Sequence, residues 1–341
     1  MKELIVVTGG TGYIGSHTAV ELMKAGYEVL IIDNLSNSRI EVLDGIEKIT
    51  GKKPHFENLD LCDKQGVIDC FKKYPAIKAI IHFAAHKAVG ESVGMPLKYY
   101  ENNLLSLINL LNSMKERQVE HFVFSSSCTV YGQPDKLPVT EESPIKKATS
   151  PYGNTKQIAE EIIEDAILAG DPINAISLRY FNPIGAHPTG HIGELPLGVP
   201  DNLVPFITQT AIGIRDELRV FGNDYNTADG SAIRDYINVV DLSRAHVVSI
   251  DRLLSGKNEI AMEVFNLGTG KGLSVLELIH AFIEATGVEF NYKIVDRREG
   301  DVEQVYADTT LANKVLGWKA GTPLADTLRS AWKWEQNLRT S

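Results

Sequence analysis

Apolar and polar positions follow two distinct rhythms along the first 180 residues of the chain. Short stretches that are apolar almost throughout predict strands, and the amphipathic segments between them predict helices. The predicted strands are "ELIVVTGG", "YEVLIID", "PHFENLD", "KAIIHFAA", "HFVFSSS" and "NAISLRYFN", and the predicted helices span 12–25, 38–49, 64–73, 97–117 and 151–169. Apolar strands joined by helices form parallel sheets covered on both faces. The pattern therefore predicts an α/β fold with a Rossmann-type doubly wound parallel sheet.

The composition of the chain changes after Asn182. The segment "PIGAHPTGHIGELPLGVPDN" is rich in glycine and proline and has no apolar periodicity. Such a segment is typical of a binding loop or of a crossing between domains. Beyond it we expect strands at "LRVFG" and "EVFNLG" and helices near 204–214, 240–254, 274–285, 309–316 and 324–337. The sequence thus predicts a Rossmann domain over 1–182 and a smaller α+β domain over 183–341, with part of 236–270 returning to the large sheet.

Composition narrows the class of protein without identifying it. The 341 residues are 43% hydrophobic and 23% charged, and their longest apolar runs fall far short of the ~20 residues of a membrane helix. The N-terminus enters an apolar strand without a signal-peptide layout, so we expect a cytoplasmic protein. Three cysteines without metal-like or redox spacing fit a reducing compartment. A formal net charge of −10 argues against a non-specific nucleic-acid binder.

A glycine-rich turn, "VVTGGTGYIGSH", joins the first predicted strand to the first predicted helix. Gly9, Gly12 and Gly15 allow a tight turn in which backbone N–H groups at a helix N-terminus approach a pyrophosphate closely. The second strand ends in Asp33, about twenty residues further on, where a carboxylate can accept hydrogen bonds from ribose hydroxyls. That carboxylate would repel a 2′-phosphate, so the pattern favours NAD over NADP, although the cation Arg39 lies nearby.

The stretch "SPYGNTK" places a tyrosine four positions ahead of a lysine. Ser150 is a good N-cap and Pro151 suits the first helical position, so a helix should begin here with Tyr152 and Lys156 on one face. A nearby ammonium and the positive helix end favour the phenolate, and a second cation in a desolvated site would lower the tyrosine pKa further. Tyr152 is therefore a candidate general base. The alternative is a packed tyrosine beside a solvated lysine.

Three consecutive serines end the strand that precedes this helix. Because side chains alternate along a strand, Ser125 and Ser127 should face one way and Ser126 the other. Hydroxyls at the carboxyl end of a parallel strand can contact a cofactor and a substrate. Alternatively, neighbouring loops supply their hydrogen-bond partners.

We expect no metal site, because His187 and His191 lack a carboxylate-rich surrounding pattern.

These features occur together, in order, in the extended short-chain dehydrogenase/reductase family, which the whole chain resembles. Within that family it is most similar to the UDP-galactose 4-epimerases, through the motifs "TGGTGYIGSHT", "DNLSNS", "HFAAHKAVGES", "FSSSCTVYG", "SPYGNTK", "RYFNPIGAHP", "FGNDYNTADGSAIRDYINVVDL", "NLGTG" and "RREGD". The resemblance implies that Tyr152 is the base, that Lys156 binds the nicotinamide ribose, and that Ser127 contacts the sugar C4 hydroxyl.

The resemblance also implies the binding residues. NAD would contact the glycine loop and the strand ends through Gly9, Gly12, Tyr13, Ile14, Gly15, Asp33, Asn34, Asn37, Ser38, Asp60, Leu61, Phe83, Ala84, Lys87, Asn102, Ser125, Tyr152, Lys156 and Phe181. The UDP-sugar would contact Ser127, Tyr152, Asn182, Asn202, Leu203, Phe221, Arg234, Arg298, Asp301 and Val305. Arginine forks match phosphate oxygens, which suits a diphosphate, although either arginine could instead form a surface ion pair.

The implied reaction interconverts UDP-galactose and UDP-glucose through a 4-keto sugar. Related 4,6-dehydratases carry an Asp-Glu pair after the active-site hydroxyl, whereas Ser127 is followed by Cys-Thr-Val, so dehydration is disfavoured. Another nucleotide-sugar epimerase, for a uronate or a pentose, remains an alternative, and so do the less favoured reductase and non-enzymatic NAD sensor. The family often has tyrosine at the position of Val305 when N-acetyl sugars are rejected, so acceptance of the N-acetylhexosamine pair is a hypothesis. The helices 97–117 and 151–169 resemble the family's dimer surface, which predicts a homodimer.

Overall fold

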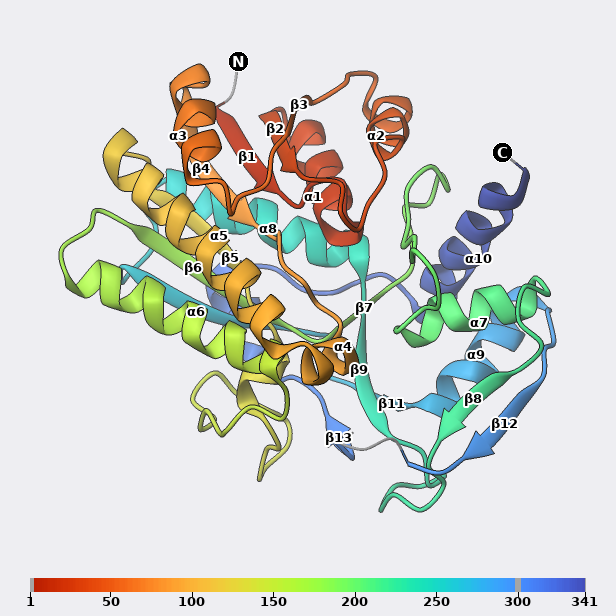
Figure 1. The fold of residues 1–341 in the computed structure, drawn as a ribbon. Coiled ribbons are helices and arrows are strands. Elements are labelled where there is room, and N and C mark those ends of the chain that lie inside the picture. The colour runs from red at the N-terminus through yellow and green to blue at the C-terminus, as the bar shows by residue number, and fades with distance from the viewer. Residues whose placement is uncertain (1–2, 298–301, 341) are drawn as a thin grey trace.

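The computed structural model describes residues 3–297 and 302–340, which surround one large sheet (Figure 1). All neighbouring strands of this seven-stranded sheet pair in parallel, in the order β10-β6-β5-β4-β1-β2-β3. The strands are β1 (Leu4–Thr8), β2 (Glu28–Asp33), β3 (His55–Asn58), β4 (Ile77–His82), β5 (His121–Ser125), β6 (Asn174–Tyr180) and β10 (Met262–Leu267). The predicted α/β doubly wound fold is confirmed.

Helices cover both faces of the sheet (Figure 1). One face carries α1 (Tyr13–Lys24), α2 (Val42–Thr50) and α8 (Val239–Leu254), and the other carries α3 (Lys64–Lys73), α5 (Pro96–Arg117) and α6 (Pro151–Leu168). The alternation of strand side chains divides the core accordingly, since Ile5 and Val7 pack on the first face whereas Val6 packs on the second. The short helix α4 (Val89–Gly94) precedes α5.

The second half of the chain builds a smaller unit. Its sheet has the order β11 (Gly272–Ser274), β9 (Ile233–Asn238) and β13 (Gln304–Val305), with β7 (Asn182–Ile184) also paired to β9, while β8 (Leu218–Phe221) pairs with β12 (Tyr292–Val295). The helices α7 (Leu203–Ala211), α9 (Val275–Thr286) and α10 (Leu324–Thr340) pack around a separate apolar core. The short strands β7, β9, β11, β12 and β13 were not anticipated, and the expected helix near 309–316 is largely a π-helical turn, η2 (Ala312–Leu316).

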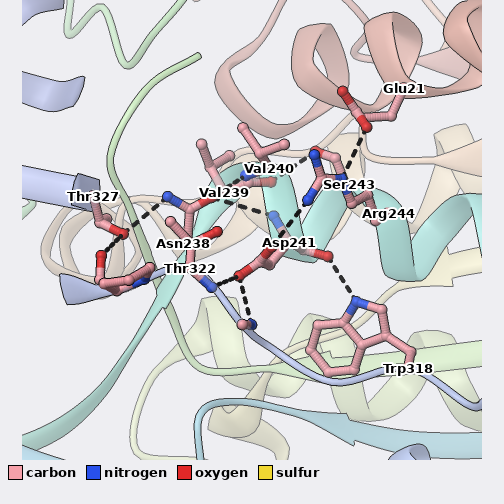
Figure 2. Close-up of polar contacts among 12 residues, drawn as sticks. Glu21, Asn238, Val239, Val240, Asp241, Ser243, Arg244, Trp318, Thr322 and Thr327 are labelled. Carbon is pink, nitrogen blue, oxygen red and sulfur yellow. Dashed lines mark hydrogen bonds and ion pairs between the residues drawn. The ribbon is translucent and has the colours of Figure 1, made fainter. Parts of the chain in front are cut away.

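The two halves are interleaved, because α8 and β10 follow β9 in the chain and yet belong to the large layer. A cluster of polar contacts around Asp241 fixes the C-terminal segment to this layer (Figure 2). Its carboxylate accepts hydrogen bonds from the amides of Gly321 at 2.9 Å and Thr322 at 2.7 Å, and its backbone carbonyl accepts one from Trp318 Nε1 at 2.9 Å. Arg244 extends the cluster to Glu21 of α1, at 3.1 Å. The division into domains at residue 182 remains a prediction.

Candidate active site

The glycine turn between β1 and α1 is packed too tightly for any side chain. Gly9 has φ of +65°, and a Cβ there would lie 2.8 Å from the backbone nitrogen of Ala84. A Cβ on Gly15 would lie 2.3 Å from the carbonyl oxygen of Gly9. In the described part of the chain, no side chain caps the N-terminus of α1 at Gly12, whereas Ser150 caps α6. First-turn N–H groups of α1 are thus available to an anionic group.

Asp33 is held rigidly where β2 ends beside the glycine turn. One carboxylate oxygen accepts hydrogen bonds from Leu35 N at 2.9 Å and Ser38 Oγ at 3.1 Å, and the other accepts one from Thr11 N at 3.2 Å. Thr11 Oγ1 also lies 2.7 Å from Ser38 Oγ. Thr11 was not among the predicted binding residues, although its place inside the glycine motif could have marked it.

The other predicted cofactor residues follow the same carboxyl edge of the sheet. Asn34 Nδ2 donates to Asp60 Oδ2 at 3.1 Å, linking the ends of β2 and β3. The remaining members lie on α1 (Tyr13, Ile14), in the loop after β2 (Asn37), after β3 (Leu61), after β4 (Phe83, Ala84, Lys87), on α5 (Asn102) and after β6 (Phe181). A glycine cradle, an uncapped helix and a fixed carboxylate together fit a dinucleotide with a free ribose 2′-hydroxyl.

The three candidate catalytic residues lie where β5 and α6 meet. Ser127 caps the 3₁₀ turn η1 (Cys128–Tyr131) and accepts a hydrogen bond from Thr129 N at 3.2 Å. Tyr152 lies in the first turn of α6, and Lys156 follows one turn later. The ammonium of Lys156 donates to the carbonyl of Ser125 at 2.6 Å and lies 6.0 Å from the centre of the Tyr152 ring.

The pKa of Tyr152 is the main correction to the sequence analysis. Burial raises this pKa to about 12, and a hydrogen-bonding interaction with Ser127 opposes the rise only in part. Burial also lowers the pKa of Lys156 to about 8, opposed by the charge of Glu160. In the chain by itself the Tyr152 phenol is therefore less acidic than the sequence suggested, because burial disfavours the phenolate.

The three serines at the end of β5 have different surroundings. Ser125 Oγ is hydrogen-bonded to the hydroxyl of Tyr180, and the two phenols of Tyr152 and Tyr180 lie close enough that ionisation of one would disfavour ionisation of the other. Ser126 is fully buried, and its Oγ has no hydrogen-bond partner among the described residues. Tyr180 was not selected from the sequence, although it precedes Phe181 in the quoted motif "RYFN".

The predicted substrate residues other than Ser127 and Tyr152 belong, where the structure describes them, to the smaller unit. Arg234 of β9 pairs in register with Val305 of β13, and its guanidinium donates to the carbonyls of Ile233 at 2.8 Å and Glu303 at 3.4 Å. The charge of Arg234 acts on the Cys128 thiol, so the arginine lies near the end of β5. Asn182 begins β7, Leu203 begins α7 and Phe221 ends β8. Arg298 and Asp301 lie outside the described residues.

Glu194 joins the two predicted sets of binding residues. Its Oε1 accepts hydrogen bonds from Lys87 Nζ at 3.3 Å and Asn202 Nδ2 at 2.5 Å. Its backbone carbonyl accepts one from Trp334 Nε1 of α10 at 2.8 Å. Glu194 was not predicted from the sequence because it lies in the aperiodic loop after Asn182.

In the parts of the chain that the structure describes, no cluster of three His, Cys, Asp or Glu could hold a metal, and no helix is long and apolar enough to cross a membrane.

Known proteins share this arrangement over the whole chain. Residues 6–331 match the family described as GDP-mannose 4,6 dehydratase. A UDP-glucose 4-epimerase of Dictyostelium discoideum is 50% identical, covering 98% of this chain and 96% of its own length, and one of Homo sapiens is 47% identical, covering 98% and 97%.

Solved structures agree with these relatives. The UDP-glucose-4-epimerase of Stenotrophomonas maltophila, with bound NAD and formylated UDP-arabinopyranose, is 44% identical with a TM-score of 0.95 and 100% of both chains covered. The UDP-glucose 4-epimerase of Bifidobacterium longum, in complex with NAD⁺ and UDP, is also 44% identical, with a TM-score of 0.94 and 98% of both chains covered. Such likeness along the full length, with the glycine turn and the tyrosine–lysine helix in place, means that the chain belongs to the UDP-glucose 4-epimerase family of extended short-chain dehydrogenases/reductases.

Proposed function

We propose that the protein is an NAD-dependent isomerase that interconverts UDP-galactose and UDP-glucose through a 4-keto sugar. The observation that carries the proposal is that Ser127, Tyr152 and Lys156 come together near the end of β5, at the same carboxyl edge of the sheet as the glycine turn, which follows β1 two strands away. A phenol, a hydroxyl and an ammonium are what the oxidation of a secondary alcohol requires from a protein. Membership of the epimerase family supports the choice of sugar.

NAD is the cofactor that the carboxyl edge of the large sheet would hold. The first turn of α1 would bind the pyrophosphate, Asp33 the adenosine ribose, and Lys156 the nicotinamide ribose. When bound, NAD⁺ supplies a hydride acceptor for the C4 hydrogen and one positive charge. That added charge matters because the pKa of Tyr152 is raised to about 12 in the chain alone.

Tyr152 would remove the proton from the C4 hydroxyl, which Ser127 would orient. With NAD⁺ bound, the C4 hydrogen would leave as hydride to the nicotinamide, so that a 4-keto sugar forms. The same tyrosine returns the proton after the ketone has been reduced on its other face, so the configuration at C4 is inverted. Between these steps the sugar must turn while its diphosphate stays fixed. Arg234, Asn202 and Phe221 would anchor the nucleotide, and the sugar itself would meet few side chains, which permits the rotation.

Dehydration is a poorer fit to the site. Elimination of water needs an acid beside the oxidised sugar, and Ser127 is followed by Cys128, Thr129 and Val130. Burial raises the pKa of the Cys128 thiol to about 12. A thiol with so high a pKa is too weak an acid to replace the carboxylic acid at neutral pH.

The proposed reaction is tested by incubating the purified protein with UDP-galactose without added cofactor. We expect UDP-glucose to form and the absorbance of reduced nicotinamide to rise only transiently, since the cofactor is regenerated. A reductase would consume added cofactor in proportion to product. No interconversion of the two sugars by protein that contains NAD would exclude the proposal.

A second candidate function is the epimerisation of UDP-N-acetylglucosamine and UDP-N-acetylgalactosamine. Val305 is buried beside Phe181 and Val130 and pairs with Arg234. Its side chain is smaller than a tyrosine, so it would leave more room for the N-acetyl group of the sugar. Turnover of UDP-N-acetylglucosamine that is lost in Val305→Tyr, with UDP-galactose turnover retained, would support it. Undetectable turnover of the N-acetyl sugar by the unmodified protein would end it.

A homodimer in the cytoplasm completes the proposal. Leu97, Leu105 and Ile108 are exposed along one face of α5, and such a stripe of apolar side chains suits burial against a second copy. The three free cysteines suit a reducing compartment. Sedimentation that gives only the monomer mass at all concentrations would refute the dimer.

A further inference from the structure

A buried ion pair joins the catalytic helix to the sheet beneath it. Glu160 lies on α6, one turn after Lys156, and Arg179 lies on β6, with side chains only 10% and 9% exposed. Arg179 donates from Nε to Glu160 Oε1 at 3.0 Å and from Nη2 to Oε2 at 2.6 Å, and Ser177 Oγ donates to Oε1 at 2.6 Å. The carboxylate is therefore fixed by three hydrogen bonds in a bidentate geometry.

The same arginine also reaches the turn that follows Ser127. Arg179 Nη1 donates to the hydroxyl of Tyr131 at 3.1 Å, and its guanidinium lies 5.0 Å from the centre of that ring. The Tyr131 hydroxyl donates to Asn266 Oδ1 of β10 at 2.7 Å. A single buried network thus connects η1 and α6, which carry the three candidate catalytic side chains, to the strands β6 and β10 of the large sheet.

Lys156 is buried, and it is the loss of solvent rather than its direct partners that disfavours its charge. Its ammonium is 4.8 Å from the centre of the Phe124 ring on β5 and takes one carbonyl, that of Ser125. From β4 it faces His82, whose imidazole is neutral because burial and the charge of Lys156 lower its pKa to about 3. Burial lowers the pKa of Lys156 itself to about 8.

The remaining titratable groups near Lys156 are the phenols of Tyr152 on its own helix and of Tyr180 on β6. Both are neutral at physiological pH, because burial raises their pKa values. The negative charge that favours the ammonium is that of Glu160.

We infer that Glu160, held by Arg179, is a positioning residue for the proposed epimerase reaction: it fixes the catalytic helix on the sheet and keeps Lys156 positively charged at neutral pH. The inference rests on the proposed function. Positions four apart on a helix share a face, so the carboxylate lies one helical turn from the lysine and its charge can act across that distance. If the negative charge of Glu160 is removed, Lys156 loses its proton at a lower pH, and the binding and electrostatic roles of the ammonium are lost with it.

The test is Glu160→Gln, which keeps the shape and the acceptor oxygen but removes the charge. The pH above which kcat falls should decrease by about one unit, the order expected for an opposite charge a few Å away. Below that pH, kcat should remain within about threefold of the unmodified protein. The ¹³Cε resonance of Lys156, assigned by its absence in Lys156→Met, should titrate at a correspondingly lower pH in cofactor-free protein, which provides a readout independent of turnover.

Two further variants separate charge from mere packing. Glu160→Gln/Arg179→Met removes both charges, so no buried guanidinium is left without a partner. The inference predicts that kcat still begins to fall at the same decreased pH as in Glu160→Gln. The matched control is Arg252→Met/Glu263→Gln, because that pair is equally buried and bidentate, at 2.6 Å and 2.7 Å, but connects α8 to β10. The control should leave the pH limit unchanged.

The inference is overturned if Glu160→Gln changes neither the pH above which kcat falls nor the pH at which Lys156 titrates. It is also overturned if both pH values in Glu160→Gln/Arg179→Met equal those of the unmodified protein. Failure of the proposed function has a different signature. In that case the unmodified protein shows no epimerisation, while the lysine titration still reports on Glu160.

Discussion

Gly15→Ala is a sharp test of the nucleotide site, because the change adds a single methyl group to the first turn of α1. That carbon would lie 2.3 Å from the carbonyl oxygen of Gly9 and 2.9 Å from Gly10 Cα. The first distance is about 1 Å inside the 3.4 Å at which ordinary van der Waals contact begins. Both neighbours are backbone atoms, so the helix must move away from the turn.

The expected changes in the free energy of unfolding and in the Kd for NAD can both be worked out. Two opposing effects determine the first, and the loss of a hydrogen bond determines the second. Overpacking costs roughly 1–3 kcal/mol, and replacing glycine by alanine in a helix returns about 1 kcal/mol. The free energy of unfolding should therefore fall by no more than about 2 kcal/mol. A shift of the helix also costs at least one charge-assisted hydrogen bond to the pyrophosphate, about 2 kcal/mol, or roughly a 30-fold weaker Kd for NAD.

Calorimetric titration of cofactor-free protein with NAD measures this Kd, and thermal unfolding checks that the variant is folded. Gly94→Ala is the matched control, because a Cβ at that helical position meets nothing within 4 Å. NAD binding within threefold of the unmodified protein in Gly15→Ala would show that the turn does not hold the pyrophosphate as described.

Three further predictions concern other groups. Tyr152→Phe should lower kcat by about 10²–10⁴-fold, the usual contribution of a general base, while calorimetry shows unchanged NAD binding; an unchanged kcat would exclude this base. Asp241→Ala should reduce the free energy of unfolding in urea by about 2–4 kcal/mol, because the amides of Gly321 and Thr322 lose a charged acceptor; a loss below about 0.5 kcal/mol would refute that role. Since burial raises the pKa of Cys128 to about 12, iodoacetamide at pH 8 should leave this thiol unmodified in the folded protein, and rapid labelling seen by peptide mass spectrometry would contradict it.

The sequence was a good guide where a local pattern determines local structure. Ser150 and Pro151 predict the start of α6, and Ser150 Oγ accepts a hydrogen bond from Gly153 N at 3.2 Å. The apolar strands β1, β2, β4, β5 and β6 were recognisable because nearly all their residues are buried, whereas the edge strand β3 is partly exposed. The strands β7, β11 and β13 were not, because they have two or three residues each and take their partners from distant parts of the chain.

Electrostatics was the harder part to anticipate. Spacing alone places Tyr152 and Lys156 on one face of a helix, but it does not reveal where the ammonium points. In the structure it donates to the Ser125 carbonyl, and burial determines the pKa of the phenol. Glu194 and Arg179 were missed for the same reason, since their partners lie more than a hundred residues away or on another element.

The interleaving of the two halves limits how this protein can be divided or recombined. A fragment that stops at residue 182 would lack β10 at the sheet edge and would strip α8 from the apolar side of α1. The segment 1–182 is then not self-contained, because an edge of its sheet and part of one covering helix layer come from the second half of the chain. Expressed alone, it would expose the apolar surfaces that β10 and α8 cover, and it should aggregate rather than fold.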